Sequence, residues 1–136
     1  TARVGVAFVR GMQGDHPSYL KTAACAKHYA VHSGPEALRH EFDAIPTLKD
    51  LHETYLPAFK ALVIEAHVES VMGAYNRTNG EACCASPTLL QEILREQWGF
   101  AGYVVSDCWR SENKIFKLLF PSPGETPKDK RLNDQQ

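Results

Sequence analysis

The apolar residues of this chain follow a helical period in three segments. They recur every three or four positions, which is the spacing that buries one face of a helix. Thr47 followed by Asp50 indicates a capped start of the second segment, and Pro57 predicts a kink or a new helix inside it. Ser86 opens the third segment and Gly99 ends it. The predicted helices are residues 3–12, 47–66 and 86–98.

Short apolar runs typical of buried strands lie between and after these helices. They are residues 22–31, 68–76 and 101–106. Strands that alternate with helices predict a parallel sheet with right-handed crossovers, either doubly wound or an arc of a barrel. Residues 32–46 are rich in Gly, Pro and mixed charge, which is typical of a long surface loop. In this loop, Arg39 and Asp43 could form an ion pair or stay solvated.

Polar residues close each predicted strand. Lys27 and His28 lie near the end of the first, Tyr75 and Asn76 close the second, and Asp107 follows the third. The carboxyl ends of strands are where barrel enzymes hold their chemistry. An Asp in such a place is more often a turn or cap residue. As a functional group, Asp107 could be a nucleophile, a general base or a metal ligand.

The other strand-end residues also allow two interpretations each. Successive strand residues point to opposite faces, so Lys27 and His28 share one pocket only if the strand ends there. They are then suited to recognise sugar hydroxyls or a carbonyl; otherwise they are a surface Lys beside a core His. Tyr75 could hold a carboxylate by a hydrogen bond or could simply pack. Four further residues are interpreted as surface residues: His32, Glu36, His52 and Glu53.

Composition narrows the range of functions. With 136 residues and 43% hydrophobic content, the chain could bury one modest core, so we expect one domain or part of one. The net charge is -1 and the basic residues are scattered along the chain, so the sequence shows no basic patch of the kind that binds nucleic acid. We therefore expect no nucleic-acid partner. No apolar run approaches the roughly 20 residues that span a bilayer. The cysteines form no CxxC pair and the histidines match no zinc spacing, so we expect neither a metal nor a cofactor.

The two ends differ from the rest of the pattern. The chain starts without Met and without a signal-peptide pattern, so we expect a piece of a longer protein. From about Arg110 the periodicity stops, and the last residues are rich in Pro and charge, which is typical of a disordered tail. The expected organisation is one α/β unit over residues 1–109 and a divergent tail over 110–136.

Five sequence blocks occur in a fixed order: Arg3–Gly11, Ala26–Ala30, Asp50–Phe59, Met72–Asn76 followed by Asn79 and Gly80, and Val104–Asp107. With these blocks, residues 1 to about 109 resemble the N-terminal domain of glycoside hydrolase family 3, which contains β-glucosidases and β-xylosidases. The resemblance implies a truncated fragment of a TIM-type (β/α) barrel with about three parallel strands. The resemblance fades after Cys108, which a frame shift or a gene truncation would explain.

The resemblance implies a role for each strand-end residue. Asp107 corresponds to the catalytic nucleophile, and Tyr75 to a residue beside it. Lys27 and His28 correspond to ligands of the hydroxyls of the terminal sugar. The stretch Tyr29–Glu36 lacks the pattern of the N-acetylglucosaminidase branch, which favours the glucosidase or xylosidase branch.

The implied reaction is hydrolysis of terminal β-linked glucose or xylose, with retention, through a covalent glycosyl-Asp intermediate. The substrate would be an oligosaccharide or an aryl glycoside. Such an enzyme needs a second carboxylic acid about 5 to 5.5 Å from the nucleophile, which in this family is a Glu far downstream. We therefore expect the fragment by itself to be inactive. The resemblance also favours a periplasmic or extracellular location.

Two other functions stay open at this point. Lys27 could be the amine nucleophile of a Schiff-base lyase, since barrel strands carry such lysines. Alternatively, Lys27 and His28 could belong to a sugar-binding remnant without catalysis. The choice between glucose and xylose, the linkage and the oligomeric state are open as well.

Overall fold

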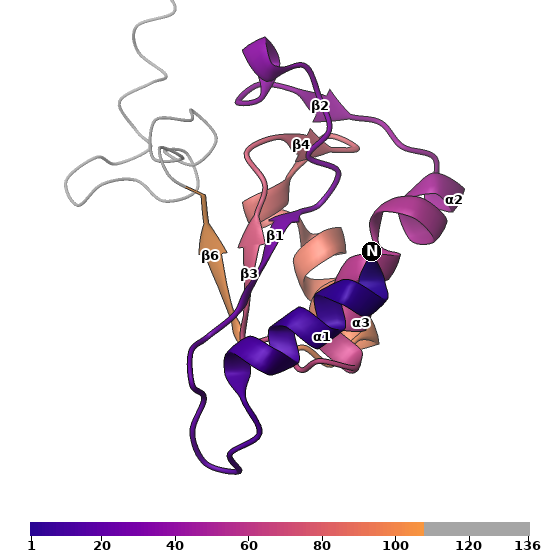
Figure 1. Ribbon diagram of the computed structural model, residues 1–136. Coiled ribbons are helices and arrows are strands. Elements are labelled where there is room, and N and C mark those ends of the chain that lie inside the picture. The colour runs from indigo at the N-terminus through magenta and orange to yellow at the C-terminus, as the bar shows by residue number, and fades with distance from the viewer. Residues whose placement is uncertain (108–136) are drawn as a thin grey trace, which may run out of the picture.

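Three parallel strands form the centre of the fold, which the computed structural model describes for residues 1–107 (Figure 1). The strands are β1 (Cys25–Tyr29), β3 (Ser70–Gly73) and β6 (Tyr103–Ser106), in the order β1-β3-β6. Both pairings are parallel. Helices connect each strand to the next, so the predicted alternation and the parallel sheet are confirmed.

Local sequence signals mark where the helices begin and end. The Thr47 hydroxyl accepts a hydrogen bond from the backbone N–H of Asp50 at 3.1 Å, and Pro57 begins a new helix. The Ser86 hydroxyl accepts from the N–H three residues on, and Gly99 has a φ of +67° where the third helical segment has ended. The helical elements are α1 (Ala2–Gln13), η1 (Glu36–Leu38), α2 (Leu48–Asp50), η2 (Leu51–Tyr55), α3 (Pro57–Ile64), η3 (Cys83–Ala85) and η4 (Pro87–Gln97).

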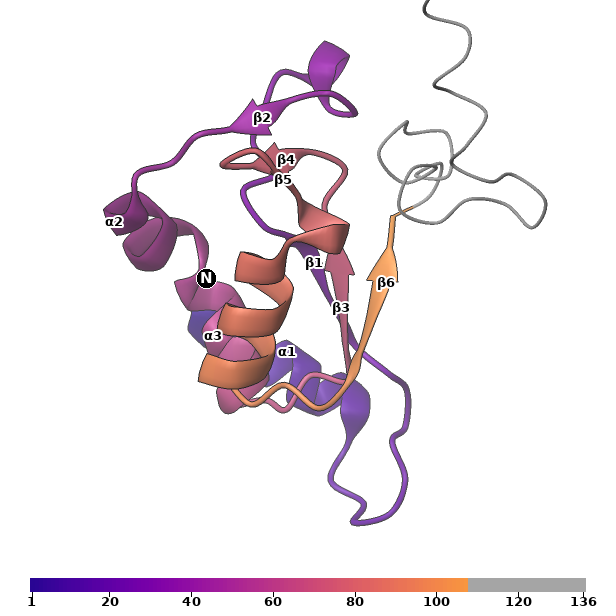
Figure 2. The ribbon, with the colours of Figure 1, turned by 180° about the vertical axis from the view of Figure 1, so that it is seen from behind.

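The longer helices α1, α3 and η4 lie on the same side of the sheet (Figures 1 and 2). Ala26, Val71 and Val104 are in register across the three strands, and Val71 in the middle is 0% exposed. The next row, which begins with the exposed Lys27, points to the other face, which the described helices leave uncovered. An arc of a barrel has this asymmetry, because its inner face packs against the parts that complete the barrel.

Gln13, at the end of α1, ties the starts of β1 and β3 together. Its buried side-chain oxygen accepts hydrogen bonds from the N–H groups of Glu69 at 2.9 Å and Ala24 at 3.4 Å. Its amide nitrogen donates to the carbonyl of His67 at 3.0 Å. These bonds satisfy polar groups that the packing of α1 would otherwise bury unpaired.

A second, small sheet lies beyond the carboxyl ends of β1 and β3 (Figure 1). Its strands are β2 (Asp43–Ala44), β4 (Arg77–Thr78) and β5 (Glu81–Ala82), in that order. The prediction of a loop over all of residues 32–46 is therefore wrong at β2. A strand of two residues has no pattern of its own, and β2 forms because β4, distant in sequence, pairs with it.

Of the two possibilities for Arg39 and Asp43, the structure does not show the ion pair. A guanidinium nitrogen of Arg39 lies 3.0 Å from a carboxylate oxygen of Glu36 instead. The two residues are three positions apart in the turn of η1, which places their side chains on one face. The Asp43 carboxylate accepts a hydrogen bond from the N–H of Gly80 at 3.0 Å, and this bond fastens β2 to the turn between β4 and β5.

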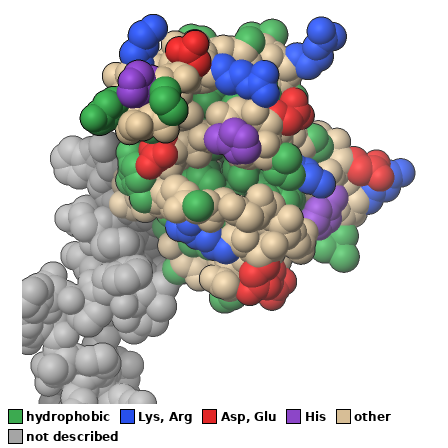
Figure 3. All heavy atoms as spheres, turned by 90° about the horizontal axis from the view of Figure 1, so that it is seen from below, with side chains coloured by type: hydrophobic (Ala, Val, Ile, Leu, Met, Phe, Trp, Pro, Cys, Tyr) green, Lys and Arg blue, Asp and Glu red, His purple; other side chains and the backbone are tan. Residues whose placement is uncertain are grey.

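The face seen from below (Figure 3) carries both acidic and basic side chains, which are interspersed. Along residues 1–107, no helix is both long enough and apolar enough to cross a bilayer. The predicted boundary at residue 109 and the predicted tail over 110–136 lie outside the described residues.

Candidate active site

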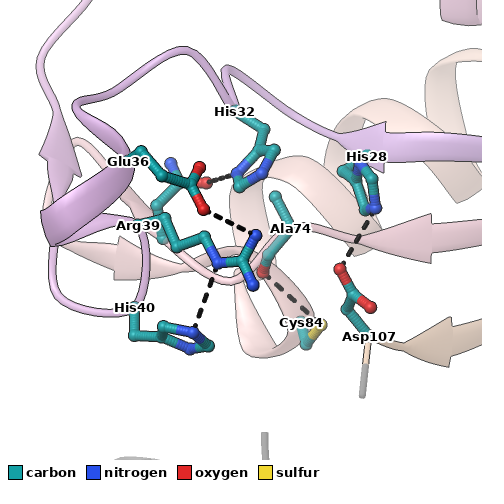
Figure 4. Close-up of polar contacts among 9 residues, drawn as sticks. His28, His32, Glu36, Arg39, His40, Ala74, Cys84 and Asp107 are labelled. Atoms are coloured by element: carbon teal, nitrogen blue, oxygen red, sulfur yellow. Dashed lines mark hydrogen bonds and ion pairs between the residues drawn. The ribbon is translucent and has the colours of Figure 1, made fainter. Parts of the chain in front are cut away.

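A carboxylate and an imidazole meet at the carboxyl edge of the parallel sheet. Nε2 of His28 lies 3.1 Å from Oδ2 of Asp107, and both side chains are largely shielded from solvent (Figure 4). His28 belongs to β1 and Asp107 follows β6, so the contact spans the intervening strand β3. Parallel strands end at one edge, which brings residues distant in sequence to the same place.

A β-bulge in β1 turns His28 toward this edge. Lys27 pairs with Met72 and Tyr29 pairs with Gly73, so His28 is an extra residue in β1. The regular alternation of side chains therefore breaks at His28, so Lys27 and His28 need not point to opposite faces of the sheet. Lys27 stays exposed on the uncovered face of the sheet.

Tyr29, next to the bulge, is fully buried on the helix side. Its hydroxyl donates a hydrogen bond to the carbonyl of Leu89 at 3.0 Å, in η4. Burial raises the pKa of the Tyr29 phenol, so the hydroxyl stays a neutral donor. This residue anchors the end of β1 to the helical layer and thereby holds the bulge in place.

A row of aromatic rings and imidazoles begins at His28 and includes His32, Tyr75 and His40. The centroid of the His32 ring lies 4.9 Å from that of His28 and 6.2 Å from that of the buried Tyr75. On its other side, Tyr75 contacts the ring of His40 at 4.4 Å, and the Arg39 guanidinium lies 5.5 Å from its centroid. The structure thus connects Tyr75 to His28 through His32.

Sequence analysis assigns no functional role to two residues of this cluster: it interprets His32 as a surface residue and Asn76 as the end of a strand. Asn76 is 2% exposed, and its amide nitrogen donates to the carbonyls of Val31 and Arg77 at 3.2 and 2.7 Å. Its side-chain oxygen lies 3.4 Å from Nδ1 of His32. The interpretation of His32 as a surface residue is therefore wrong. The spacing of His32 from His28 carries no signal, because the chain between them is irregular.

The electrostatic surroundings favour a neutral His28. Burial is the largest effect and lowers the pKa of the His28 imidazole, and the nearby His32, Lys27 and Arg39 lower it further. The carboxylate of Asp107 acts in the opposite direction and raises it, but the net pKa lies below the ordinary value. Neutral His28 can donate its Nε2–H to the carboxylate of Asp107.

Two further features bear on where a site could lie: a surface hollow and the grouping of potential metal ligands. A surface hollow of about 510 Å³ lies between α3 and η4, and none of the site residues lines it. Within residues 1–107, no group of three His, Cys, Asp or Glu side chains is placed to hold a metal ion. The groups that meet at the carboxyl edge are the carboxylate of Asp107 and the imidazoles of His28 and His32.

Parallel strands joined by helices, with an ionisable pair at their carboxyl edge, are features of a barrel-type enzyme domain. The chain belongs to glycosyl hydrolase family 3, because the sequence model of the N-terminal domain of that family matches residues 1–119. The predicted family and the predicted α/β barrel fold are confirmed by this match and by the solved relatives.

Three relatives illustrate the similarity. A xylan 1,4-β-xylosidase of Xylanibacter ruminicola is 53% identical over 110 residues, which cover 79% of this chain and 13% of that protein. The structure of an exo-β-xylosidase with a xylobiose aziridine probe matches with a TM-score of 0.76 and 36% identity, over 82% of this chain and 15% of the other. The structure of β-glucosidase 3B of Thermotoga neapolitana with glycerol matches with a TM-score of 0.68 and 38% identity, over 75% of this chain and 14% of the other. The chain thus spans a small part of each relative.

Proposed function

We propose that this chain supplies the nucleophile and part of the sugar-binding wall of a retaining β-glycosidase. The enzyme would release terminal β-linked xylose or glucose from oligosaccharides or aryl glycosides. The observation that carries the proposal is the contact of His28 with Asp107 at the carboxyl edge of the sheet. Family membership and the similarity to proteins named β-xylosidase and β-glucosidase support the substrate class.

The proposed reaction has two steps. The Asp107 carboxylate attacks the anomeric carbon, and the bond to the leaving oxygen breaks as a second carboxylic acid protonates that oxygen. The resulting glycosyl ester is then hydrolysed by water, which gives its proton to the same second group, and the sugar leaves with its configuration retained. We assign the second carboxylic acid to a segment beyond this chain.

The neighbours of Asp107 prepare it for attack. The Nε2–H of His28 holds Oδ2 of Asp107, which restricts the rotation of the carboxylate and so directs the other oxygen. Because His28 is neutral, it does this without withdrawing as much charge from the nucleophile as an imidazolium would. The ammonium of Lys27, exposed beside the bulge, is available to bind hydroxyls of the sugar. The ring of Tyr75 packs near that of His32 and completes this side of the site.

The chain alone is expected to release no nitrophenol from nitrophenyl β-xyloside or β-glucoside. It contains the nucleophile, but the proposal places the acid that must protonate the leaving group outside it. A steady-state assay of the purified chain against buffer measures this. Turnover that disappears in the Asp107→Asn variant would show that an acid within this chain suffices.

Trapping of the intermediate tests the proposal directly. The protein to use is a chimaera, in which residues 1–107 replace the matching segment of the Xylanibacter ruminicola xylosidase. A 2-deoxy-2-fluoro-β-xyloside or β-glucoside with a good leaving group should inactivate it. The fluorine slows both formation and hydrolysis of the glycosyl ester, whereas the good leaving group speeds its formation, so the ester accumulates. Peptide mass spectrometry should locate the fluorosugar on Asp107.

The controls separate the possible outcomes. The Asp107→Asn chimaera should stay unlabelled, and a Glu53→Gln chimaera, changed at an exposed residue of η2, should label like the parent. A fluorosugar found on another residue would refute Asp107 as nucleophile. The inhibitor that acts faster identifies xylose or glucose as the preferred sugar.

The two alternative functions have less support. A Schiff-base lyase has less support because the sequence model that matches this chain is that of a glycosyl hydrolase family. Borohydride trapping of a carbonyl compound on Lys27 would favour the lyase. A sugar-binding remnant would bind xylose or glucose in a calorimetric titration but would give no fluorosugar ester in the chimaera.

A further inference from the structure

The side-chain amide of Asn76 has a fixed orientation. Its nitrogen faces two backbone carbonyls, those of Val31 and Arg77, at 3.2 and 2.7 Å. The reverse orientation would place an amide oxygen against two carbonyl oxygens, with no hydrogen between them. Because the group is also buried, its two polar ends cannot exchange partners with water. The oxygen of Asn76 therefore faces His32.

This orientation determines the tautomer of His32. The oxygen of Asn76 can only accept a hydrogen bond, so Nδ1 of His32, 3.4 Å away, must carry the hydrogen. The ring is then held between Asn76 on one side and the ring of His28, 4.9 Å away, on the other. Figure 4 shows the side chains of His28, from β1, and His32, from the segment after β1, pointing to the same side of their ribbon, with Asp107 below His28.

We propose that His32 is a positioning residue, which Asn76 holds through Nδ1–H and whose ring keeps His28 turned with Nε2 toward Asp107. The meaning of this arrangement for catalysis rests on the proposed function, whereas the arrangement itself can be measured without turnover. The charged or titratable groups that act on His28 are Asp107 after β6, Lys27 in β1, and His32 and Arg39 in the following segment. Of these, His32 is the one whose ring contacts it.

Two substitutions separate the two properties of His32. His32→Phe keeps a ring beside His28 and removes the N–H, whereas His32→Asn keeps a donor near Nδ1 and removes the ring. Both remove a group that disfavours charge on His28, so the pKa of His28 should rise in both variants. Only His32→Asn, which lacks the ring, should allow the imidazole of His28 to rotate away from Asp107. His52→Phe, at an exposed position of η2, is the matched control.

Nuclear magnetic resonance of the whole chain with ¹⁵N-labelled histidine provides the measurement. In the parent and in His52→Phe, we expect His32 protonated at Nδ1 and a slowly exchanging Nε2–H on His28. In His32→Phe this hydrogen should stay protected, and in His32→Asn it should exchange rapidly. His28 should titrate at a higher pH in both His32 variants than in the control. An Nε2–H tautomer of His32 in the parent, or an unchanged His28 in both folded variants, would overturn the proposal.

The same substitutions in the chimaera give a second measurement, which does not depend on the folding of the isolated chain. We expect kcat to fall in His32→Asn, because a released His28 no longer holds Oδ2 of Asp107. The acid limb of the pH profile of kcat/KM should move to higher pH in both variants, since His28 must be neutral. An unmoved acid limb would overturn the proposal. An inactive parent chimaera would instead count against the proposed function and would leave the spectroscopic result valid.

Discussion

Replacement of Asp107 by Asn in the chimaera is expected to lower kcat by on the order of 10⁴-fold or more, because the amide cannot form the glycosyl ester. The amide oxygen can still accept the Nε2–H of His28, so the fold and the sugar site should survive. KM should therefore change little. Hydrolysis of nitrophenyl β-xyloside under steady-state conditions measures both constants.

A smaller residue at this position allows a stricter test. In Asp107→Gly, the space left by the carboxylate can admit azide, a small anionic nucleophile. Azide should restore release of the leaving group and should produce the α-glycosyl azide, because it attacks from the face that Asp107 occupied. Formation of the β-azide, or no rescue together with high residual activity in Asp107→Asn, would show that Asp107 is not the nucleophile.

Gly102→Ala is expected to have the largest effect on stability. An ideal Cβ at Gly102 would lie 2.0 Å from the backbone oxygen of Glu69, which no rotation of a side chain can relieve. That oxygen accepts the hydrogen bond from Tyr103 N that starts the pairing of β6 with β3. The main chain must move, at a cost of roughly 1–3 kcal/mol or more, which is typical of overpacking.

The consequence of Gly102→Ala should reach the active site. Asp107 follows the same strand, and a displaced β6 would carry the carboxylate away from His28. We expect the chimaera to lose activity at a lower temperature and to show a lower kcat. Gly11→Ala in α1 is the control, because a Cβ there meets nothing within 4 Å and favours the helix by up to about 1 kcal/mol. Equal thermal stability of the two variants would contradict this reading of β6.

The helices and strands could be predicted because their signals are local. The cap at Thr47, the restart at Pro57 and the left-handed Gly99 each depend on a few neighbouring residues. The small second sheet could not be predicted in this way. Its strands are two residues long, and β2 exists only because β4 pairs with it. The pairing of Arg39 with Glu36 likewise depends on the turn of η1, which the loop interpretation did not include.

The candidate site was predictable in part. The residues at the strand ends were identifiable because parallel strands place their carboxyl ends at one edge. The roles assigned to Asp107, Lys27, His28 and Tyr75 remain predictions, which the trapping and substitution experiments test. His32 was missed because its importance comes from Asn76, 44 positions away, and from the ring of His28.

The sequence by itself determined the family, the alternation of helices with parallel strands, and the set of polar residues that close those strands. These follow from local periodicity and from ordered blocks of residues. Only the tertiary structure decided that His28 reaches Asp107 across β3 and that Asn76 orients His32. Such contacts depend on the register of three strands and on one bulged residue, and a shift by a single position would turn the side chains to the other face.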